Sequence, residues 1–245
     1  RLGGGAPARA GRRVLGFAVV FVALGWDDMG KAEQLLWGTL AVALPWIGGT
    51  FLRRSGQPLA EHGSNVLMAV GAVALILFTY TVANIAGWYP ERSFSRADRD
   101  RQEAIMLTGQ ALSVAATAFF AFRFRAAWML AISGFIGWMA WTQGVSLYWR
   151  PDREVDPALW KVALYGAALI AVGLVLAGRA WRQHAFVLVF VGLVVAFVFL
   201  GIDAYDDALG PTGLLFLGMA FVAIVLSVIT EFRVFLVFGA LGLYG

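Results

Sequence analysis

The sequence contains no cysteine, and in 245 residues it has only two histidines, His62 and His184. Without cysteine the chain has no disulfide framework, no thiolate metal site and no cysteine nucleophile. Both histidines lie in polar turns, whereas a haem held by two histidines needs its ligands inside a helical bundle. We therefore expect no metal site, no resident cofactor and no histidine buried inside a membrane span.

Charged residues are also scarce. They make up 14% of the chain, and hydrophobic residues make up 60%, whereas soluble proteins have about 25% charged and 45–50% apolar residues. This composition is typical of an integral membrane protein. The net charge of +4 does not indicate nucleic-acid binding, because Lys and Arg are scattered at the ends of apolar runs, where they anchor helices at a membrane surface.

Long apolar runs dominate the chain. A helix needs roughly 20 residues to cross a bilayer core of about 30 Å, and these runs are continuously apolar, which favours helices over the alternating strands of a barrel. We predict an all-α polytopic transmembrane helical bundle with eight full spans and a truncated ninth, forming one domain (14–245) after a basic tail (1–13). The first run is short, and an interfacial segment is the alternative there. The predicted spans are 14–26, 35–52, 66–88, 105–122, 126–149, 159–177, 185–202, 212–229 and the run that begins at 234.

The connections between the runs alternate in chemistry. Turns after even-numbered runs are rich in Arg, and loops after odd-numbered runs are acidic or mixed and open with an aromatic residue. These aromatic residues, spaced by 62, 61 and 56 positions, are Trp26, Trp88, Trp149 and Tyr205. An aromatic belt marks one membrane interface and Arg the other, so the pattern predicts tandem helical hairpins that each cross the membrane twice.

The balance of basic residues predicts the orientation. With the N-terminal tail, the Arg-rich side carries 11 of the 19 Lys and Arg and 2 of the 15 acids. By the positive-inside rule this side is cytoplasmic, which places the N-terminus inside. Arg outnumbers Lys by 17 to 2, which suggests a GC-rich genome, and we expect a bacterial inner membrane. The chain starts without Met and stops within an apolar run, so we expect both ends to be truncated.

An acidic cluster follows the seventh run, in the segment LGIDAYDDALGP at 200–211. We favour a solvated turn, because carboxylates on a short connection keep its hairpin from sinking into lipid. The spacing also resembles, in reverse, the aspartate-rich motif of prenyl-diphosphate enzymes, which would imply Mg²⁺ held against a diphosphate. Partial Ca²⁺ coordination is a further alternative. The outer acidic residues are Asp27, Asp28, Asp203, Asp206 and Asp207.

Four polar residues inside the runs are candidates for an outward-facing vestibule: Thr81, Asn84, Gln110 and Gln143. A wet pocket rimmed by carboxylates would attract a cation or an amine. The alternative is hydrogen bonding between helices, worth about 0.6–2 kcal/mol per contact. We favour the alternative, because ion-coupled carriers usually bury an ionisable residue near the middle of the membrane and the eight complete runs have none there.

Small residues in the sixth run predict close helix packing. Gly166, Ala167, Ala171 and Gly173 would let neighbouring backbones approach, so we expect the even-numbered helices to pack centrally. The connector 93–104 carries balanced charges. It could form a short surface helix with ion pairs along one face, or a solvated loop.

The chain has no P-loop, no G-x-S-x-G and no H-E-x-x-H motif, so no catalytic residue can be assigned. By elimination we expect a non-enzymatic accessory or scaffold subunit of a larger membrane assembly, with membrane lipids and other membrane protein subunits as its partners and bound lipids as its only ligands. The alternative is a transporter or channel that uses the vestibule. A third possibility is a lipid-modifying enzyme that uses the outer carboxylates.

Overall fold

The computed structural model of the chain describes residues 26, 29–88, 96–148, 159–206, 210–230 and 232–244. Within these residues the chain forms eight α-helices and no strand, which confirms the all-α prediction. A short 3-10 helix, η2 (Arg179–Trp181), precedes the seventh helix. The α-helices are α2 (Lys31–Arg54), α3 (Pro58–Ile85), α4 (Arg96–Arg123), α5 (Met129–Tyr148), α6 (Leu159–Val175), α7 (Arg182–Asp206), α8 (Pro211–Thr230) and α9 (Arg233–Tyr244).

Each predicted span from residue 35 onward corresponds to one of these helices, and the run 14–26 lies outside the described residues except for Trp26. The connector 93–104 behaves differently from either expectation. From Arg96 onward it is the first part of α4, so it forms neither a separate surface helix nor a loop. The stretch between Arg96 and Thr108 contains no Gly or Pro, and its Arg, Gln, Glu and Ala favour a helix, so nothing interrupts α4 where the hydropathy falls.

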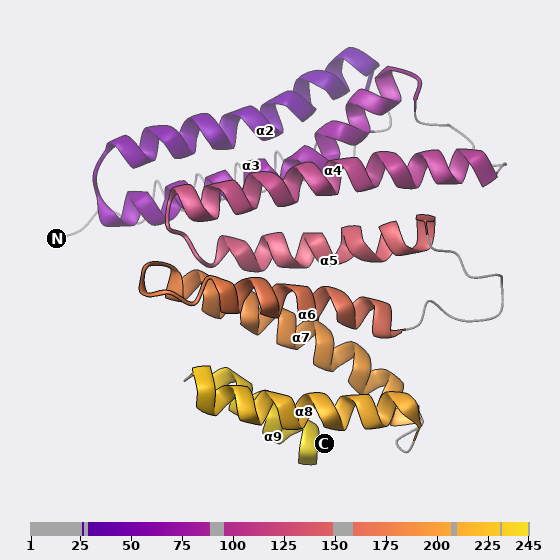
Figure 1. The fold of residues 1–245 in the computed structure, drawn as a ribbon. Coiled ribbons are helices and arrows are strands. Elements are labelled where there is room, and N and C mark those ends of the chain that lie inside the picture. Colours follow the sequence, from indigo (N-terminus) through magenta and orange to yellow (C-terminus); the bar gives the residue numbers. More distant parts are fainter. Residues whose placement is uncertain are drawn as a thin grey trace, which may run out of the picture.

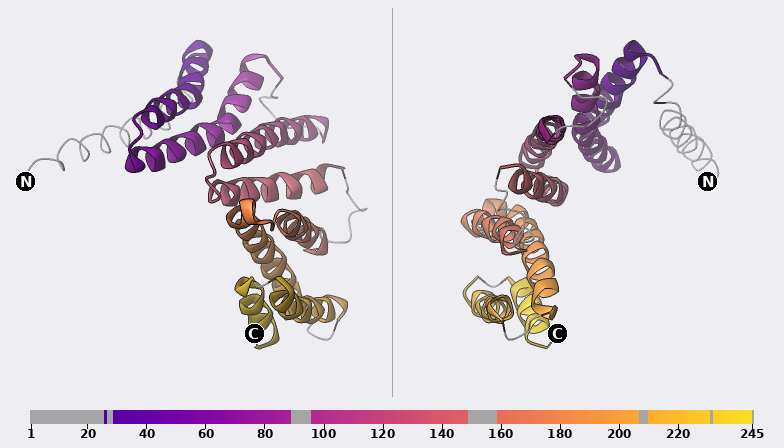
Figure 2. Two further views of the ribbon diagram at one scale, coloured as in Figure 1. Left: turned by 60° about the vertical axis from the view of Figure 1, so that its left-hand side comes forward. Right: turned by 90° about the vertical axis from the view of Figure 1, so that its right-hand side faces the viewer.

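Successive helices run in opposite directions and follow one another in a bent row (Figure 1; Figure 2, right). Most contacts join neighbours in the sequence, above all α6 with α7 and α2 with α3. Helix α7 also contacts α5, α8 and α9, which makes it the best-covered helix of the row.

The prediction that even-numbered helices pack centrally is wrong. Half of the membrane-length part of α7 is buried, against 11% for α2 and 17% for α8. Gly38, Gly48 and Gly49 of α2 lie against its neighbour α3, and α2 begins the described row. Position in the row, rather than residue size alone, decides which helix is covered.

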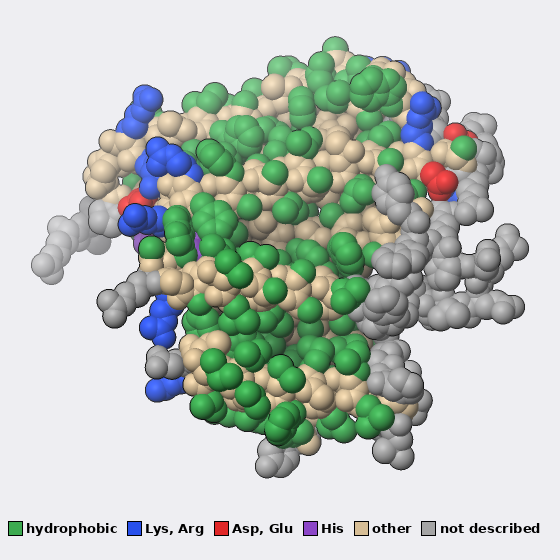
Figure 3. All heavy atoms as spheres, in the orientation of Figure 1, with side chains coloured by type: hydrophobic (Ala, Val, Ile, Leu, Met, Phe, Trp, Pro, Cys, Tyr) green, Lys and Arg blue, Asp and Glu red, His purple; other side chains and the backbone are tan. Residues whose placement is uncertain are grey.

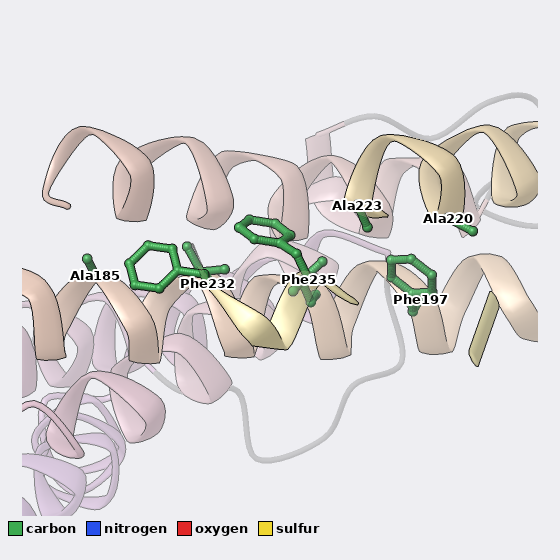
Figure 4. Packing of buried hydrophobic residues seen from close by; sticks show 8 residues of the cluster. Ala185, Phe197, Ala220, Ala223, Phe232 and Phe235 are labelled. Atoms are coloured by element: carbon green, nitrogen blue, oxygen red, sulfur yellow. The ribbon is translucent and has the colours of Figure 1, made fainter. Parts of the chain in front are cut away.

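Two hydrophobic clusters hold the row together, and α7 contributes to both. The first cluster lies between α7, α8 and α9, where the rings of Phe197, Phe232 and Phe235 fill the space between the helices (Figure 4). The second lies between α3, α4, α5 and α7 and includes Met129 and Leu188. Since Leu188 and Val189 are consecutive and belong to different clusters, α7 packs on both sides.

Two glycines bring the backbones of α6 and α7 into close contact. A Cβ atom added to Gly166 would lie 2.5 Å from the carbonyl oxygen of Gly192, and one added to Gly192 would lie 2.6 Å from that of Gly166. Gly173 is also buried against α7, which confirms close packing at both predicted glycines. Ala167 and Ala171 are exposed on the opposite side of α6.

In the part of the chain that the structure describes, five helices are long and apolar enough to cross a membrane: Lys31–Arg54, Leu59–Ile85, Ala97–Arg123, Arg182–Ile202 and Gly213–Thr230. The stretches Ala163–Val175 and Arg233–Leu243 are apolar but shorter. Apolar side chains cover most of the visible face of the molecule between its two ends (Figure 3). These features are those of a membrane-embedded, multi-pass protein.

Candidate functional site: an arginine-lined groove

Basic side chains gather along one edge of the row, where one set of helix ends lies. Figure 3 shows Lys and Arg along the edge where the turns α2–α3, α4–α5 and α6–α7 lie in Figure 1. These turns begin after the helix ends at Arg54, Arg123 and Val175. Their guanidinium groups therefore lie outside the apolar surface and can reach a polar headgroup region.

A groove of about 950 Å³ opens at this basic end. Its walls come from three parts of the chain that lie far apart in the sequence: the α4–α5 turn, the start of α7 with η2, and the start of α9. Three of its residues carry a guanidinium group: Arg125, Arg182 and Arg233. The lining residues are Arg125, Ala127, Ala180, Arg182, Gln183, His184, Phe186, Val187, Phe232 and Arg233.

Arg125 has a left-handed backbone, with φ of 54°. It follows the end of α4, where the Ala126 N–H donates to the Ala121 carbonyl at 3.0 Å and the Arg125 N–H donates to the Phe122 carbonyl at 3.4 Å. This pattern of hydrogen bonds is the Schellman cap, in which glycine normally occupies the left-handed position. An arginine there costs about 1 kcal/mol of backbone strain, yet it places a charged side chain at the rim of the groove.

His184 fixes the floor of the groove. Its side chain is 3% exposed, and its Nε2–H donates to the carbonyl oxygen of Ala121 at 3.1 Å. The imidazole stacks on Phe122 with ring centroids 5.3 Å apart and meets Trp181 edge-on at 5.0 Å. The start of α7 is therefore held against the end of α4.

His184 lies just before the predicted span 185–202, yet it is buried in the first turn of α7. Its position before an apolar run suggested a polar turn, but η2 and α7 carry it against the end of α4. His62, in contrast, is exposed on α3. The pair Trp181 and His184, three residues apart, was the only sequence signal of this packing.

The groove is basic. Its described lining includes the guanidinium groups of Arg125, Arg182 and Arg233 and no carboxylate. Arg182 lies 6.0 Å from the Phe232 ring. The neighbouring α2–α3 turn differs, because there Arg53 forms an ion pair with Glu61 at 3.2 Å and also covers the Phe124 ring at 4.1 Å.

A helix end adds to this positive potential. Helix α9 begins at Arg233 and has no acidic residue in its first turn, whereas α7 continues directly from η2. The first N–H groups of a helix have no partner within it and carry partial positive charge. The groove therefore suits an anion better than a cation or a neutral solute.

The predicted vestibule residues occupy different helix interfaces. Thr81 is buried, donates to the Leu77 carbonyl at 2.9 Å and lies against Gly38 of α2. Asn84 is half-buried in the last turn of α3, and Gln143 is half-buried on α5. A pocket of about 320 Å³ near that end of α3 is lined by Trp88, Arg101, Ala104, Ile105 and Thr108 instead. The vestibule stays a prediction.

Gln110 belongs to a polar seam on α4. It is 2% exposed, and Ser113 is fully buried one turn later. Gln110 Oε1 and Ser113 Oγ have no hydrogen-bond partner within the described part of the chain. Nearby, the Ser133 hydroxyl of α5 donates to the Val114 carbonyl at 3.2 Å, so polar groups line the contact between α4 and α5.

The predicted acidic cluster falls largely outside the described residues. Asp27, Asp28 and Asp207 are not described, and Asp203 and Asp206 are described only as part of the α7 backbone. Helix α7 extends to Asp206, so two of the three aspartates of the predicted turn belong to its end. The proposed roles of these carboxylates stay predictions.

No family model matches the chain, and no curated protein or solved structure is significantly similar to it.

Proposed function

We propose that the chain is a non-enzymatic scaffold subunit of a bacterial inner-membrane assembly. In this proposal it crosses the membrane eight times as tandem helical hairpins, and α9 is a ninth, shorter membrane segment. Its N-terminus and the Arg-rich turns face the cytoplasm, in agreement with the positive-inside rule. Neighbouring membrane proteins bind to the helix faces that the row leaves uncovered.

The observation that carries the proposal is the outer face of α6. The glycines of this helix are used against α7, and on the opposite side Ala167, Ala168 and Ala171 are all exposed. Helices associate in membranes through such small residues, because they allow close approach of two backbones. Lipid chains gain nothing from small residues, so the face is better suited to another helix.

The bent row supports the same function. A carrier needs a path enclosed by several helices, whereas most contacts here join sequence neighbours. Both sides of the row therefore remain available to other subunits. Bulky exposed residues on α2 and α8, such as Phe51 at 74% and Val228 at 78%, would lie against lipid.

The proposal is tested by native mass spectrometry after extraction in mild detergent. We expect the chain in a complex of fixed stoichiometry with at least one other membrane protein. Ala168→Trp and Ala171→Trp should dissociate that complex, because the large ring prevents close approach. Val228→Trp, which changes an exposed residue on α8 instead, is the control. A lone monomer, or complexes unaffected by the α6 variants, would contradict the proposal.

The orientation has its own test, because a chain without cysteine gives a unique label at any introduced cysteine. Arg54→Cys and Trp88→Cys lie near opposite ends of neighbouring helices. In intact cells a membrane-impermeant maleimide should label the residue at 88 and not the one at 54. Equal labelling of both residues, or labelling of 54 alone, would refute the orientation.

A transporter remains the second candidate because of the polar seam. The buried Gln110 Oε1 and Ser113 Oγ without partners would gain hydrogen bonds from water or from a polar solute. In proteoliposomes, the variant Asn84→Leu, Gln110→Leu, Gln143→Leu should then abolish cation flux while the fold persists. Flux that is absent from the wild type, or unchanged in the variant, would remove this candidate.

A further inference from the structure

We infer that the groove between the α4–α5 turn, the start of α7 and the start of α9 is a binding site for the phosphate of an anionic phospholipid. Arg125, Arg182 and Arg233 surround it from three separate elements. A guanidinium group matches a phosphate because it can donate two parallel hydrogen bonds to it. This site does not depend on the scaffold function or on any partner protein.

The charge of the groove favours an anion of this kind. Its described lining holds three guanidinium groups and no carboxylate. Glu231 adjoins this region in the sequence and lies outside the described residues; if it is counted, the basic residues still outnumber it by three to one. Gln183 and the N–H groups at the start of α9 offer further donors to phosphate oxygens.

The apolar half of the lining identifies a lipid rather than a free anion. Phe186, Val187 and Phe232 lie on the same groove as the arginines. The ring of Phe186 is 44% exposed on α7, so the groove continues onto an apolar helix face. A phospholipid has a phosphate and an acyl chain that fit these two parts, whereas inorganic phosphate uses only the first.

The location of the groove agrees with this ligand. It lies at the end of the apolar helices, where Lys and Arg gather (Figure 3) and where lipid headgroups meet a membrane protein. Its volume of about 950 Å³ is within the range of small-molecule sites, roughly 300–1,000 Å³. The left-handed conformation of Arg125 keeps an arginine at a position where glycine would fit without strain.

The test measures binding of soluble short-chain lipids to the detergent-purified chain by the fluorescence of its tryptophans, one of which, Trp181, packs against His184. The probes are dihexanoyl phosphatidylglycerol, dihexanoyl phosphatidylcholine and inorganic phosphate. We expect saturable binding of phosphatidylglycerol, with affinity at least tenfold higher than for the other two probes. The variant Arg182→Gln, Arg233→Gln should weaken it about tenfold or more, because each lost guanidinium removes charge-assisted hydrogen bonds.

A matched control separates the groove from the general charge of this end. Arg54→Gln, Arg123→Gln removes the same charge from two exposed arginines that do not line the groove, and it should bind phosphatidylglycerol as the wild type does. Arg125→Gly removes the third guanidinium at a position where glycine suits the backbone, so weaker binding by this variant cannot be ascribed to misfolding.

Three results would overturn the inference. An equal loss of phosphatidylglycerol binding in the control and groove variants would indicate that binding depends on the general charge of the surface. Inorganic phosphate binding as tightly as phosphatidylglycerol would indicate a site for a free anion. Unchanged binding in both groove variants would show that the arginines do not contact the lipid.

Discussion

Nε2 of His184 and the carbonyl oxygen of Ala121 lie 3.1 Å apart, although 63 residues separate them in the sequence. A carbonyl oxygen can only accept, so Nε2 carries the hydrogen atom. The same oxygen accepts the Ala126 N–H at 3.0 Å. One acceptor therefore fixes the end of α4, the turn that follows it and the start of α7, and these are the elements that position the arginine groove.

Removal of this imidazole should destabilise the protein. His184→Ala loses a buried hydrogen bond and two ring contacts and leaves a cavity, which together cost about 2–4 kcal/mol. Unfolding in increasing concentrations of SDS, followed by circular dichroism, measures the change. His62→Ala alters the other, exposed histidine and should leave the unfolding midpoint unchanged; similar midpoints for the two variants would show that the His184 contact contributes little.

The glycine contact between α6 and α7 should not accept a methyl group. In Gly166→Ala the new Cβ would meet the Gly192 carbonyl and Ala196, so the helices must separate, at a cost of about 1–3 kcal/mol. Thermal unfolding in detergent would reveal a lower midpoint. The control is Gly218→Ala on α8, where nothing lies within 4 Å of the added Cβ. If both variants unfold at the same temperature, α6 and α7 are not packed this closely.

Replacement of Arg125 by glycine should stabilise the protein by about 1 kcal/mol, because glycine adopts the left-handed conformation without strain. The same replacement at Arg123, the last residue of α4, should be destabilising, since glycine weakens a helix. The unfolding midpoints of Arg125→Gly and Arg123→Gly, measured under the same denaturing conditions, should shift in opposite directions from that of the wild type. A lower midpoint for Arg125→Gly would mean that the Arg125 side chain contributes more to stability than the strain costs.

A substitution at Gln110 tests whether the polar residues of α4 only pack between helices or bind a solute. If its buried Oε1 has no partner, Gln110→Leu removes an unsatisfied polar group and should raise the stability by about 1 kcal/mol. Ser133→Ala on the facing helix breaks the hydrogen bond to the Val114 carbonyl and should lower it by a similar amount. Loss of stability in Gln110→Leu would instead indicate that water or a solute satisfies the amide.

Hydropathy predicted where the helices run but not where they end. The apolar run 105–122 predicts the core of α4, yet the helix begins at Arg96 because charged residues with long side chains are good helix formers. In the same way, α7 continues to Asp206, past the apolar run 185–202. Hydropathy detects burial in lipid, whereas helix length follows backbone hydrogen bonding.

The candidate site was harder to predict because its parts lie far apart in the sequence. Arg125, Arg182 and Arg233 were visible as basic turns, but their convergence depends on how α4, α5, α7 and α9 pack. Small residues were also only partly predictive of helix contacts. Gly166 and Gly173 could be identified as contact residues, but Ala167 and Ala171 on the same helix face outward, because a helix in a row has a neighbour on only some of its sides.

The bent row has a thermodynamic consequence. When each helix is held mainly by the next one along the chain, stability is a sum of nearest-neighbour terms, as in repeat proteins. Damage to α8 and α9 should then leave α2 and α3 intact, and melting should proceed in stages. Helix α7 is the exception, because it belongs to both hydrophobic clusters; its loss would divide the molecule into two independently melting halves.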